Sequence, residues 1–88
     1  MKNKMLEQYR NELDNVDKEI INLLAKRFEI VQKIWNFKKE NNIWILQLWR
    51  WEEVLENRKQ IAKDLWINEN LIEYIWNLIH EEALKLEK

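Results

Sequence analysis

The feature that most constrains this chain is an apolar seam that recurs every three or four residues from Leu6 to Phe37. This spacing places side chains along one face of an α-helix, and no Pro or Gly interrupts it. We therefore predict one long helix from Met5 to about Lys39, roughly 52 Å in length at ~1.5 Å per residue. The seam consists of Leu6, Tyr9, Leu13, Val16, Ile20, Leu23, Arg27, Ile30, Ile34 and Phe37.

Arg27 is the one charged residue in this seam. A guanidinium group keeps its proton and is costly to bury alone, so an arginine at a core position requires an anion opposite it. Two arrangements satisfy that requirement. One is an ion pair with an Asp or Glu of another helix, which the seam alone favours. The other is a pocket for an anionic ligand.

The length of the predicted helix bears on the assembly of the protein. A compact domain of this size is only roughly 30 Å across, so the helix extends beyond its own domain. A chain this short also buries only about 60 to 65% of its unfolded surface. A second copy packed along the helix would cover the seam, and we expect an intertwined or side-by-side helical homodimer.

The charged residues and the hydropathy exclude several classes of partner. Fifteen Lys and Arg are interleaved with sixteen Asp and Glu, which leaves a net charge of -1, so we expect no nucleic-acid partner. No apolar run approaches the ~20 residues of a membrane span, so we expect no membrane partner either. The opening residues Lys2 to Glu7 lack the apolar core of a signal peptide. A soluble, cytoplasmic protein is the resulting expectation.

The residue types that are missing restrict both the chemistry and the origin of the chain. It has no cysteine and one histidine, His80, which excludes disulfides, Cys/His metal sites and Ser-His or Cys-His nucleophiles. Gly, Pro, Ser and Thr are also absent, whereas six residues are tryptophan. This composition suggests an engineered or alphabet-restricted sequence. The tryptophans follow no common face, so we interpret them as packing residues and His80 as an ordinary polar residue.

The rest of the chain predicts two further helices. Asn41 and Asn42 are the nearest approach to a helix stop, so the segment 41–51 is expected to connect the long helix to a second one over about Trp49 to Leu65. That second helix would turn Val54, Leu55, Ile61, Ala62 and Leu65 inward. The seam register fails at 66–68, where Asn68 is a suitable N-cap for a third helix. The prediction is an all-α chain of three helices, long, medium and medium.

An alternative follows from the same heptad count. The three-four spacing continues from Asn41 through Trp44, Leu48 and Trp51 without a slip. Helices one and two would then form a single helix from Met5 to Leu65. Such a helix cannot fold back on itself, so it would require a swapped or larger assembly.

The cations of the first helix have a defined spacing. Arg27 and Lys38 are eleven residues apart, so they project from one side of the helix about 16 Å apart. Arg10 precedes Arg27 by roughly 25 Å and is turned by about 100°. It can therefore join a small-molecule site with Arg27 only from the partner in an antiparallel dimer. Taken singly, Arg10 and Lys38 are more simply interpreted as solvated residues or exposed ion pairs.

Three segments carry a resemblance to a known family. The segment from Tyr9 to Lys38, YRNELDNVDKEIINLLAKRFEIVQKIWNFK, resembles the first helix of the all-helical (AroQ-type) chorismate mutases. The next, KENNIWILQLWRWEEVL, is similar to the family's loop and second-helix start. DLWINENL resembles the second turn, with Trp66 in place of the usual Gly. The match runs from about Leu6 to Glu87, and residues 1–88 are identified as a single chorismate mutase-like domain.

This resemblance implies a fold, an activity and a set of site residues. The family forms an intertwined dimer of three-helix chains that converts chorismate to prephenate without a cofactor, a metal or a covalent intermediate. Arg10 from the partner and Arg27 would bind the two substrate carboxylates, and Lys38 would hydrogen-bond the breaking ether oxygen. Arg50 would support the site, and Glu87 would lie beside the same ether oxygen.

The departures from the family pattern affect the predicted substrate-binding residues. Trp51 replaces the carboxylate that holds the substrate hydroxyl, and Gln47 replaces the loop Asp. Ala83 replaces a common Ser, and His80 stands where an aliphatic residue is usual. We expect a chorismate mutase of weakened activity in Phe and Tyr biosynthesis. The alternative is a non-catalytic helical bundle or self-assembling oligomer that keeps only the packing pattern.

Overall fold

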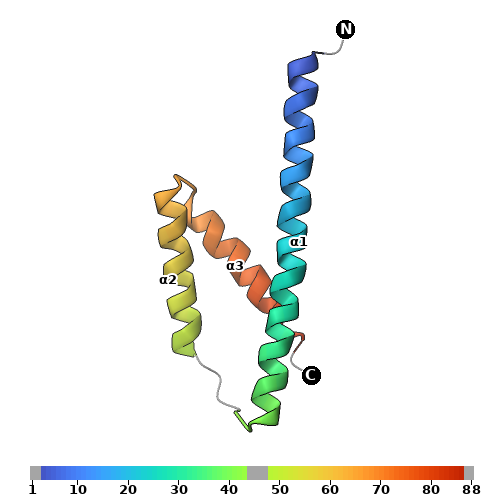
Figure 1. The fold of residues 1–88 in the computed structure, drawn as a ribbon. Helices are drawn as coiled ribbons and strands as arrows, with labels where there is room; N and C mark the ends of the chain where they lie inside the picture. The colour runs from blue at the N-terminus through green and yellow to red at the C-terminus, as the bar shows by residue number, and fades with distance from the viewer. Residues whose placement is uncertain (1–2, 44–47, 87–88) are drawn as a thin grey trace.

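A computed structural model describes residues 3–43 and 48–86, and these residues form three helices (Figure 1). The helix α1 spans Lys4–Glu40, α2 spans Leu48–Asp64 and α3 spans Glu69–Leu84. The predicted all-α chain with one long and two medium helices is confirmed. Each predicted helix agrees with the structure to within about two residues at its start, a normal margin for helix ends.

Side-chain caps fix both ends of α1. The Asn3 side-chain oxygen accepts hydrogen bonds from the backbone N–H groups of Met5 and Leu6, at 3.0 and 3.3 Å. At the other end, the Asn41 side-chain amide donates to the carbonyl of Phe37 at 2.9 Å. Asn42 then adopts a left-handed conformation with φ 54°. Asparagine tolerates this conformation better than most residues, so the Asn pair ends the helix without a glycine.

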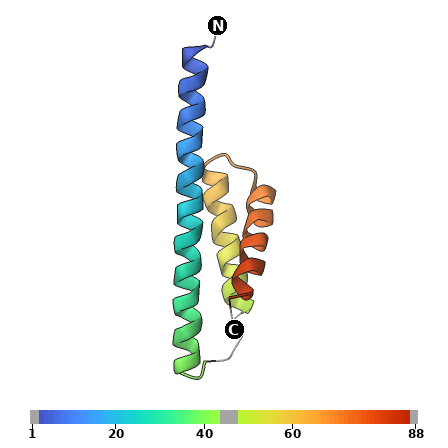
Figure 2. The ribbon, with the colours of Figure 1, turned by 90° about the vertical axis from the view of Figure 1, so that its right-hand side faces the viewer.

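The alternative of one continuous helix through residues 41–51 is therefore wrong. The helix α2 runs in the direction opposite to α1 in both side views (Figure 1, Figure 2). The heptad spacing persists across the connection, but the backbone at Asn42 leaves the helical region. Hydrophobic periodicity shows which side chains would share a face of a helix. It does not show where one residue leaves the helical conformation and reverses the chain.

The connection between α2 and α3 is a tight turn around Trp66. The backbone N–H of Ile67 donates to the carbonyl of Ala62 at 2.8 Å, which closes the last turn of α2. Trp66 adopts φ 61° and its side chain is 96% exposed. The Asn68 side chain accepts from the N–H groups of Asn70 and Leu71, at 2.8 and 3.3 Å, so the predicted N-cap of α3 is confirmed.

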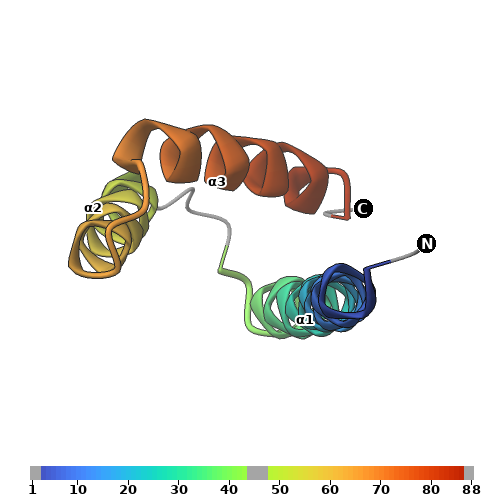
Figure 3. The ribbon, with the colours of Figure 1, turned by 90° about the horizontal axis from the view of Figure 1, so that it is seen from above.

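The core of the single chain is small and lies mainly between α2 and α3. Among the residues whose burial the structure describes, the buried apolar ones are Val54 and Ala62 of α2 and Ile79 and Ala83 of α3. Seen from above, α3 leads from the end of α2 toward α1 (Figure 3). The described residues extend over 63 × 25 × 16 Å. This elongated shape leaves much of α1 beyond the other two helices, as both side views show (Figure 1, Figure 2).

Several apolar residues predicted to face inward are exposed in the single chain. Ile61 of α2 and Leu65, which follows the helix, are 48% and 63% exposed, which corrects their assignment to the core of the chain. Seam residues of α1 are exposed as well. None of the described helices is long and apolar enough to cross a membrane. The exposed seam residues are Leu6, Tyr9, Leu13, Val16, Ile20, Leu23, Ile30, Ile34 and Phe37.

Candidate functional site

A cavity of about 190 Å³ lies where the C-terminal half of α1 meets the start of α2 and the end of α3. All three helices contribute to its walls, so the site depends on the fold of the whole chain. Its lining combines three cations with apolar and aromatic side chains. The lining residues are Arg27, Val31, Ile34, Trp35 and Lys38 of α1, Arg50, Trp51 and Val54 of α2, and His80, Ala83 and Leu84 of α3.

The face that α1 presents to this cavity follows from helical geometry. Arg27, Val31, Ile34 and Lys38 are spaced by four, three and four residues, which places them on one stripe of the helix. This stripe contains the seam position Arg27 and ends at Lys38. The prediction that these two cations project from one side of the helix is therefore confirmed, since both line the same cavity.

Arg27 is the most perturbed cation of the site. Its side chain is partly buried, and burial lowers the pKa of its guanidinium, with a further lowering from the positive charge of Arg58. No carboxylate forms an ion pair with Arg27 within residues 3–43 and 48–86. The interhelical ion pair favoured by the seam is thus not found in the described part of the chain. Arg27 carries a charge that an anionic ligand would compensate.

Lys38 is held near the cavity by an aromatic neighbour. Its ammonium lies over the ring of Trp35, 4.9 Å from the ring centroid, as a cation–π contact. The Trp35 indole N–H donates in turn to the backbone carbonyl of Ala83 at 3.4 Å. This hydrogen bond ties α1 to α3 beside the cavity. Lys38 keeps its ammonium donors for a ligand, because the contact with Trp35 uses the ring face rather than a hydrogen bond.

Arg50 contributes the third cation from the first turns of α2. Its guanidinium pairs with the Glu53 carboxylate one turn later, and both side chains are largely exposed. An exposed pair of this kind is worth under about 1 kcal/mol. Arg50 can therefore exchange Glu53 for an anionic ligand at low cost.

The opposite wall is an aromatic pair that joins α2 to α3. The rings of Trp51 and His80 stack with their centroids 4.0 Å apart and an interplanar angle of 15°. Burial lowers the pKa of His80, the positive charge of Arg27 lowers it further, and the Glu81 carboxylate opposes both effects. Because the pKa falls below its ordinary value near 6.5, His80 is neutral at neutral pH.

The cavity brings together five of the predicted site residues, namely Arg27, Lys38, Arg50, Trp51 and Ala83. Gln47 and Glu87, which the resemblance also places at the site, lie outside the described residues. The lining residues that are described include no Asp or Glu. The pocket is therefore suited to an anion, and it offers donors and positive charge rather than a carboxylate base.

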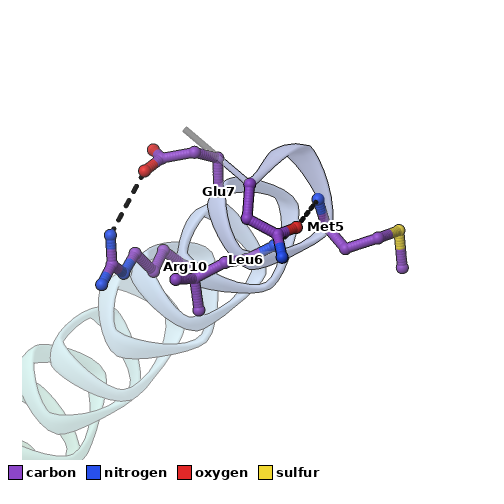
Figure 4. Close-up of polar contacts among 5 residues, drawn as sticks. Met5, Leu6, Glu7 and Arg10 are labelled. Carbon is purple, nitrogen blue, oxygen red and sulfur yellow. Dashed lines mark hydrogen bonds and ion pairs between the residues drawn. The ribbon is translucent and has the colours of Figure 1, made fainter. Parts of the chain in front are cut away.

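Arg10 is not part of this cavity in the single chain. It lies in the first turns of α1, where its guanidinium pairs with the Glu7 carboxylate at 3.2 Å (Figure 4). Its side chain is 62% exposed. The seventeen positions between Arg10 and Arg27 correspond to roughly 25 Å of helix. The expectation that Arg10 cannot join Arg27 within one chain is confirmed.

Six residues that line the cavity are not among the predicted site residues, and two of these six, Trp35 and His80, have a polar ring nitrogen. The sequence pattern favours a packing role for the tryptophans and an ordinary polar role for His80. A signal was present for each, because Trp35 is one turn before Lys38 and His80 is one turn before Ala83. Helical spacing from a predicted site residue is the criterion that would have found them. No group of three or more metal-ligating side chains occurs among the described residues.

Comparisons with known proteins point in one direction. The model of the family described as chorismate mutase type II matches residues 9–88. A bifunctional chorismate mutase/prephenate dehydratase from Buchnera aphidicola subsp. Schizaphis graminum is 37% identical over 87 residues, which cover 99% of this chain and 22% of that protein. The T-protein of Enterobacter agglomerans is 31% identical over 78 residues, 89% of this chain and 21% of the relative.

A third relative is also named as a chorismate mutase. The bifunctional chorismate mutase/prephenate dehydratase from Buchnera aphidicola subsp. Baizongia pistaciae is 31% identical over 88 residues, which are 100% of this chain and 24% of that protein. The chain thus spans under a quarter of the length of these curated relatives. No solved structure matches the chain.

Proposed function

This chain belongs to the chorismate mutase type II family, and we propose on that basis that it rearranges chorismate to prephenate. The observation that carries the proposal is the grouping of Arg27, Lys38 and Arg50 around one cavity whose described lining includes no acidic residue. Chorismate carries two carboxylates and an ether oxygen that gains negative charge as its bond breaks. Fixed cations are therefore the groups that this reaction requires.

The proposed mechanism is electrostatic and conformational. Arg27 binds one substrate carboxylate, because its charge is partly desolvated and lacks an ion-pair partner in the described part of the chain. Lys38 donates to the ether oxygen, and Arg50 supports the anion from the start of α2. Cations held in place before the reaction stabilise the charge-separated transition state without reorganisation, and the apolar walls hold the substrate in its reactive conformation.

Arg10 enters the proposal from a second copy of the chain. The seam residues from Leu6 to Leu23 are exposed, although apolar residues at this spacing normally pack against another helix. In an antiparallel homodimer, the start of one α1 passes the C-terminal half of the other. Arg10 would then reach the second substrate carboxylate. Its ion pair with Glu7 is exposed, so replacing Glu7 by the substrate would cost little free energy.

A groove on the α2–α3 pair supports the same dimer. It has a volume of about 300 Å³ and an almost wholly apolar surface. Arg58 at its edge is close enough to lower the pKa of Arg27. The N-terminal seam of a partner α1 matches this groove in chemistry. The groove is lined by Arg58, Ile61, Ala62, Leu65, Ile67, Ile72 and Trp76.

The volume of the active-site cavity agrees with a site that a second chain completes. Its 190 Å³ is below the range of about 300–1,000 Å³ that is usual for small-molecule pockets. A wall supplied by the partner would enclose further volume. We infer a homodimer with two such sites, each built from one chain and completed by Arg10 of the other.

The wider role of the proposed reaction is in aromatic amino-acid biosynthesis. Two relatives are named for a prephenate dehydratase activity beside the mutase. Prephenate made by this chain would accordingly be a precursor of phenylalanine or tyrosine. Since the chain corresponds to a fraction of those relatives, we extend only the mutase activity to it.

The decisive test is chorismate consumption by the purified protein. We expect Arg27→Ala to lower kcat/KM by about 10²–10³, the usual effect of removing one donor to a developing charge. Lys26→Ala is the matched control, since Lys26 is the neighbouring exposed cation on α1. Equal rates for the parent and Arg27→Ala would reject the enzyme and favour a non-catalytic helical assembly, for which the exposed apolar seam is the supporting observation.

Glu87 provides a second test through pH. The resemblance puts it beside the ether oxygen, where a carboxyl group can donate a hydrogen bond only when it is protonated. We therefore expect activity to rise below neutral pH and Glu87→Gln to flatten the profile, because an amide donates at every pH. A flat profile in the parent protein would contradict this role.

A further inference from the structure

The site has an unusual balance of hydrogen-bonding groups. Arginine and lysine side chains only donate, and so does the indole of tryptophan. The aliphatic lining residues have no polar side-chain atom. Among the described residues of the cavity, the imidazole of His80 is therefore the one side chain that offers a hydrogen-bond acceptor.

The protonation state of His80 leaves that acceptor available. A neutral imidazole has one nitrogen that donates and one that accepts, whereas the protonated ring only donates. Burial and the nearby charge of Arg27 lower the pKa of His80, and Glu81 raises it by a smaller amount. The neutral ring is thus the form present at neutral pH. No hydrogen bond to either nitrogen of His80 occurs within the described ranges 3–43 and 48–86.

The stack on Trp51 determines how this ring can be used. The two rings are nearly parallel, with centroids 4.0 Å apart, so one face of the imidazole is covered by the indole. The nitrogens lie on the edge of the ring, in the plane of the stack. Rotation out of this plane would break the contact, which restrains the direction of the nitrogen lone pair. A hydrogen bond to a restrained group costs less conformational entropy than one to a free side chain.

A substrate hydroxyl has a matching need. Chorismate carries one ring hydroxyl besides its two carboxylates and its ether oxygen. The cations of the pocket satisfy the anionic groups, but they cannot accept the proton of a hydroxyl. A hydroxyl buried without an acceptor would lose part of its hydrogen bonding to water, which is costly.

We propose that His80, restrained by its stack on Trp51, accepts a hydrogen bond from the substrate's ring hydroxyl and so makes the pocket selective for hydroxylated dianions. This assignment rests on the proposed function for the identity of the substrate. It makes His80 a substrate-binding residue and Trp51 the residue that positions it. The aromatic pair is then a specificity determinant rather than only a packing contact between α2 and α3.

The test uses binding, so that it does not depend on turnover. The probes are a bicyclic ether dicarboxylate that carries the ring hydroxyl and its counterpart with hydrogen in that place. We expect the parent protein to bind the hydroxylated probe about tenfold more tightly, the value of roughly one hydrogen bond. The readout is the ratio of the two dissociation constants, measured by titration calorimetry.

The variants separate hydrogen bonding from packing. We expect His80→Leu to reduce the ratio to about one, and His80→Gln, which keeps an acceptor, to restore part of it. The ratio of dissociation constants in Trp51→Phe should be closer to that of the parent than the ratio in Trp51→Ala, because only Phe keeps an aromatic ring on which His80 can stack. Asn77→Leu is the folding control, a change from polar to leucine at an exposed position of the same helix.

The outcomes distinguish this inference from the proposed function. An unchanged ratio in His80→Leu, or no preference in the parent protein, would overturn the role of His80. Binding of both probes with the expected ratio, but without chorismate turnover, would support His80 as the hydroxyl acceptor and reject the proposed activity. If neither probe binds to the parent protein, both proposals fail.

Discussion

Residues 4–24 and 27–38 of α1 continue one apolar seam, yet their surroundings differ. The second segment lines a cavity with α2 and α3 and is tied to α3 by the hydrogen bond from Trp35 to Ala83. The first segment extends past the other helices, and its seam residues are exposed (Figure 2). The seam residues Ile30, Ile34 and Phe37 of the second segment are exposed as well, at 47%, 47% and 60%. The two segments therefore differ in the cavity that the second one lines, whereas the apolar seam needs a partner along both.

The cations of the two segments differ in the same way. Arg27 is partly buried, and its pKa is lowered by burial, whereas Arg10 is exposed and paired with Glu7. A charge held in a desolvated environment is prepared to bind an anion. A charge on an exposed helix end acquires that property only when another surface covers it. The proposed dimer would give both arginines the same role at one site.

The largest expected effect comes from placing a charge in the exposed seam. Ile20→Asp should dissociate the dimer and lower activity by at least about 10², because burying an unpaired carboxylate costs several kcal/mol. Ile21→Asp is the matched control, since Ile21 is equally apolar and exposed but lies about 100° away from the seam. Sedimentation velocity and the chorismate assay measure the two effects. Identical behaviour of the two variants would show that the seam is not an interface.

Removing Arg10 should affect activity far more than stability. We expect Arg10→Ala to lower kcat/KM by about 10², since one substrate carboxylate loses its cation. Its pair with Glu7 is exposed, so the free energy of unfolding should change by less than about 1 kcal/mol. Urea unfolding and steady-state kinetics provide the two numbers, with Lys18→Ala as an exposed cation in the same half of α1. A loss of activity matched by an equal loss of stability would mean that Arg10 is structural.

Trp66 allows a stability test away from both segments of α1. Its φ of 61° is unfavourable for a residue with a Cβ atom, and its side chain is 96% exposed. Trp66→Gly should therefore stabilise the protein by about 1 kcal/mol. For a domain of this size that corresponds to a rise in Tm of roughly 4–8 °C. A lower Tm in this variant would show that the exposed indole makes a contact in the assembly.

The smallest expected effect is a pH dependence of stability from His80. Its pKa is lowered in the folded protein by burial and by Arg27, so the unfolded chain binds a proton more readily. Stability from this group is fully present above the unfolded pKa near 6.5 and is lost as pH falls through the folded pKa. We expect the parent to lose more stability than His80→Leu between about pH 7 and pH 5. Parallel curves for the two proteins would contradict this assignment.

Local signals predicted most of the secondary structure. The heptad spacing identified α1, and Asn68 identified the start of α3 because its side chain caps the helix directly. Helical geometry also placed Arg27 and Lys38 on one side. These features depend on residues within a few turns of one another, where dihedral preferences and spacing are sufficient.

Features that depend on how helices cross could not be predicted in the same way. The stack of Trp51 on His80 joins residues of two helices, and nothing in their local spacing indicates that they meet. Ile61 and Leu65 have the apolar character of core residues but are exposed in the single chain. Periodicity marks a face for burial without saying whether the same chain or another one covers it.

The central claim is that each active site needs Arg27 of one chain and Arg10 of another, and mixing two inactive variants tests it most directly. Unfolding and refolding Arg10→Ala together with Arg27→Ala should restore about a quarter of parental activity, since half of the dimers are mixed and each has one complete site. Arg27→Ala mixed with Lys38→Ala is the control. Each chain supplies both Arg27 and Lys38 to its own site, so every site in that mixed dimer lacks one of the two and none is complete. Recovery in the first mixture alone would confirm the account, and no recovery in either mixture would contradict it.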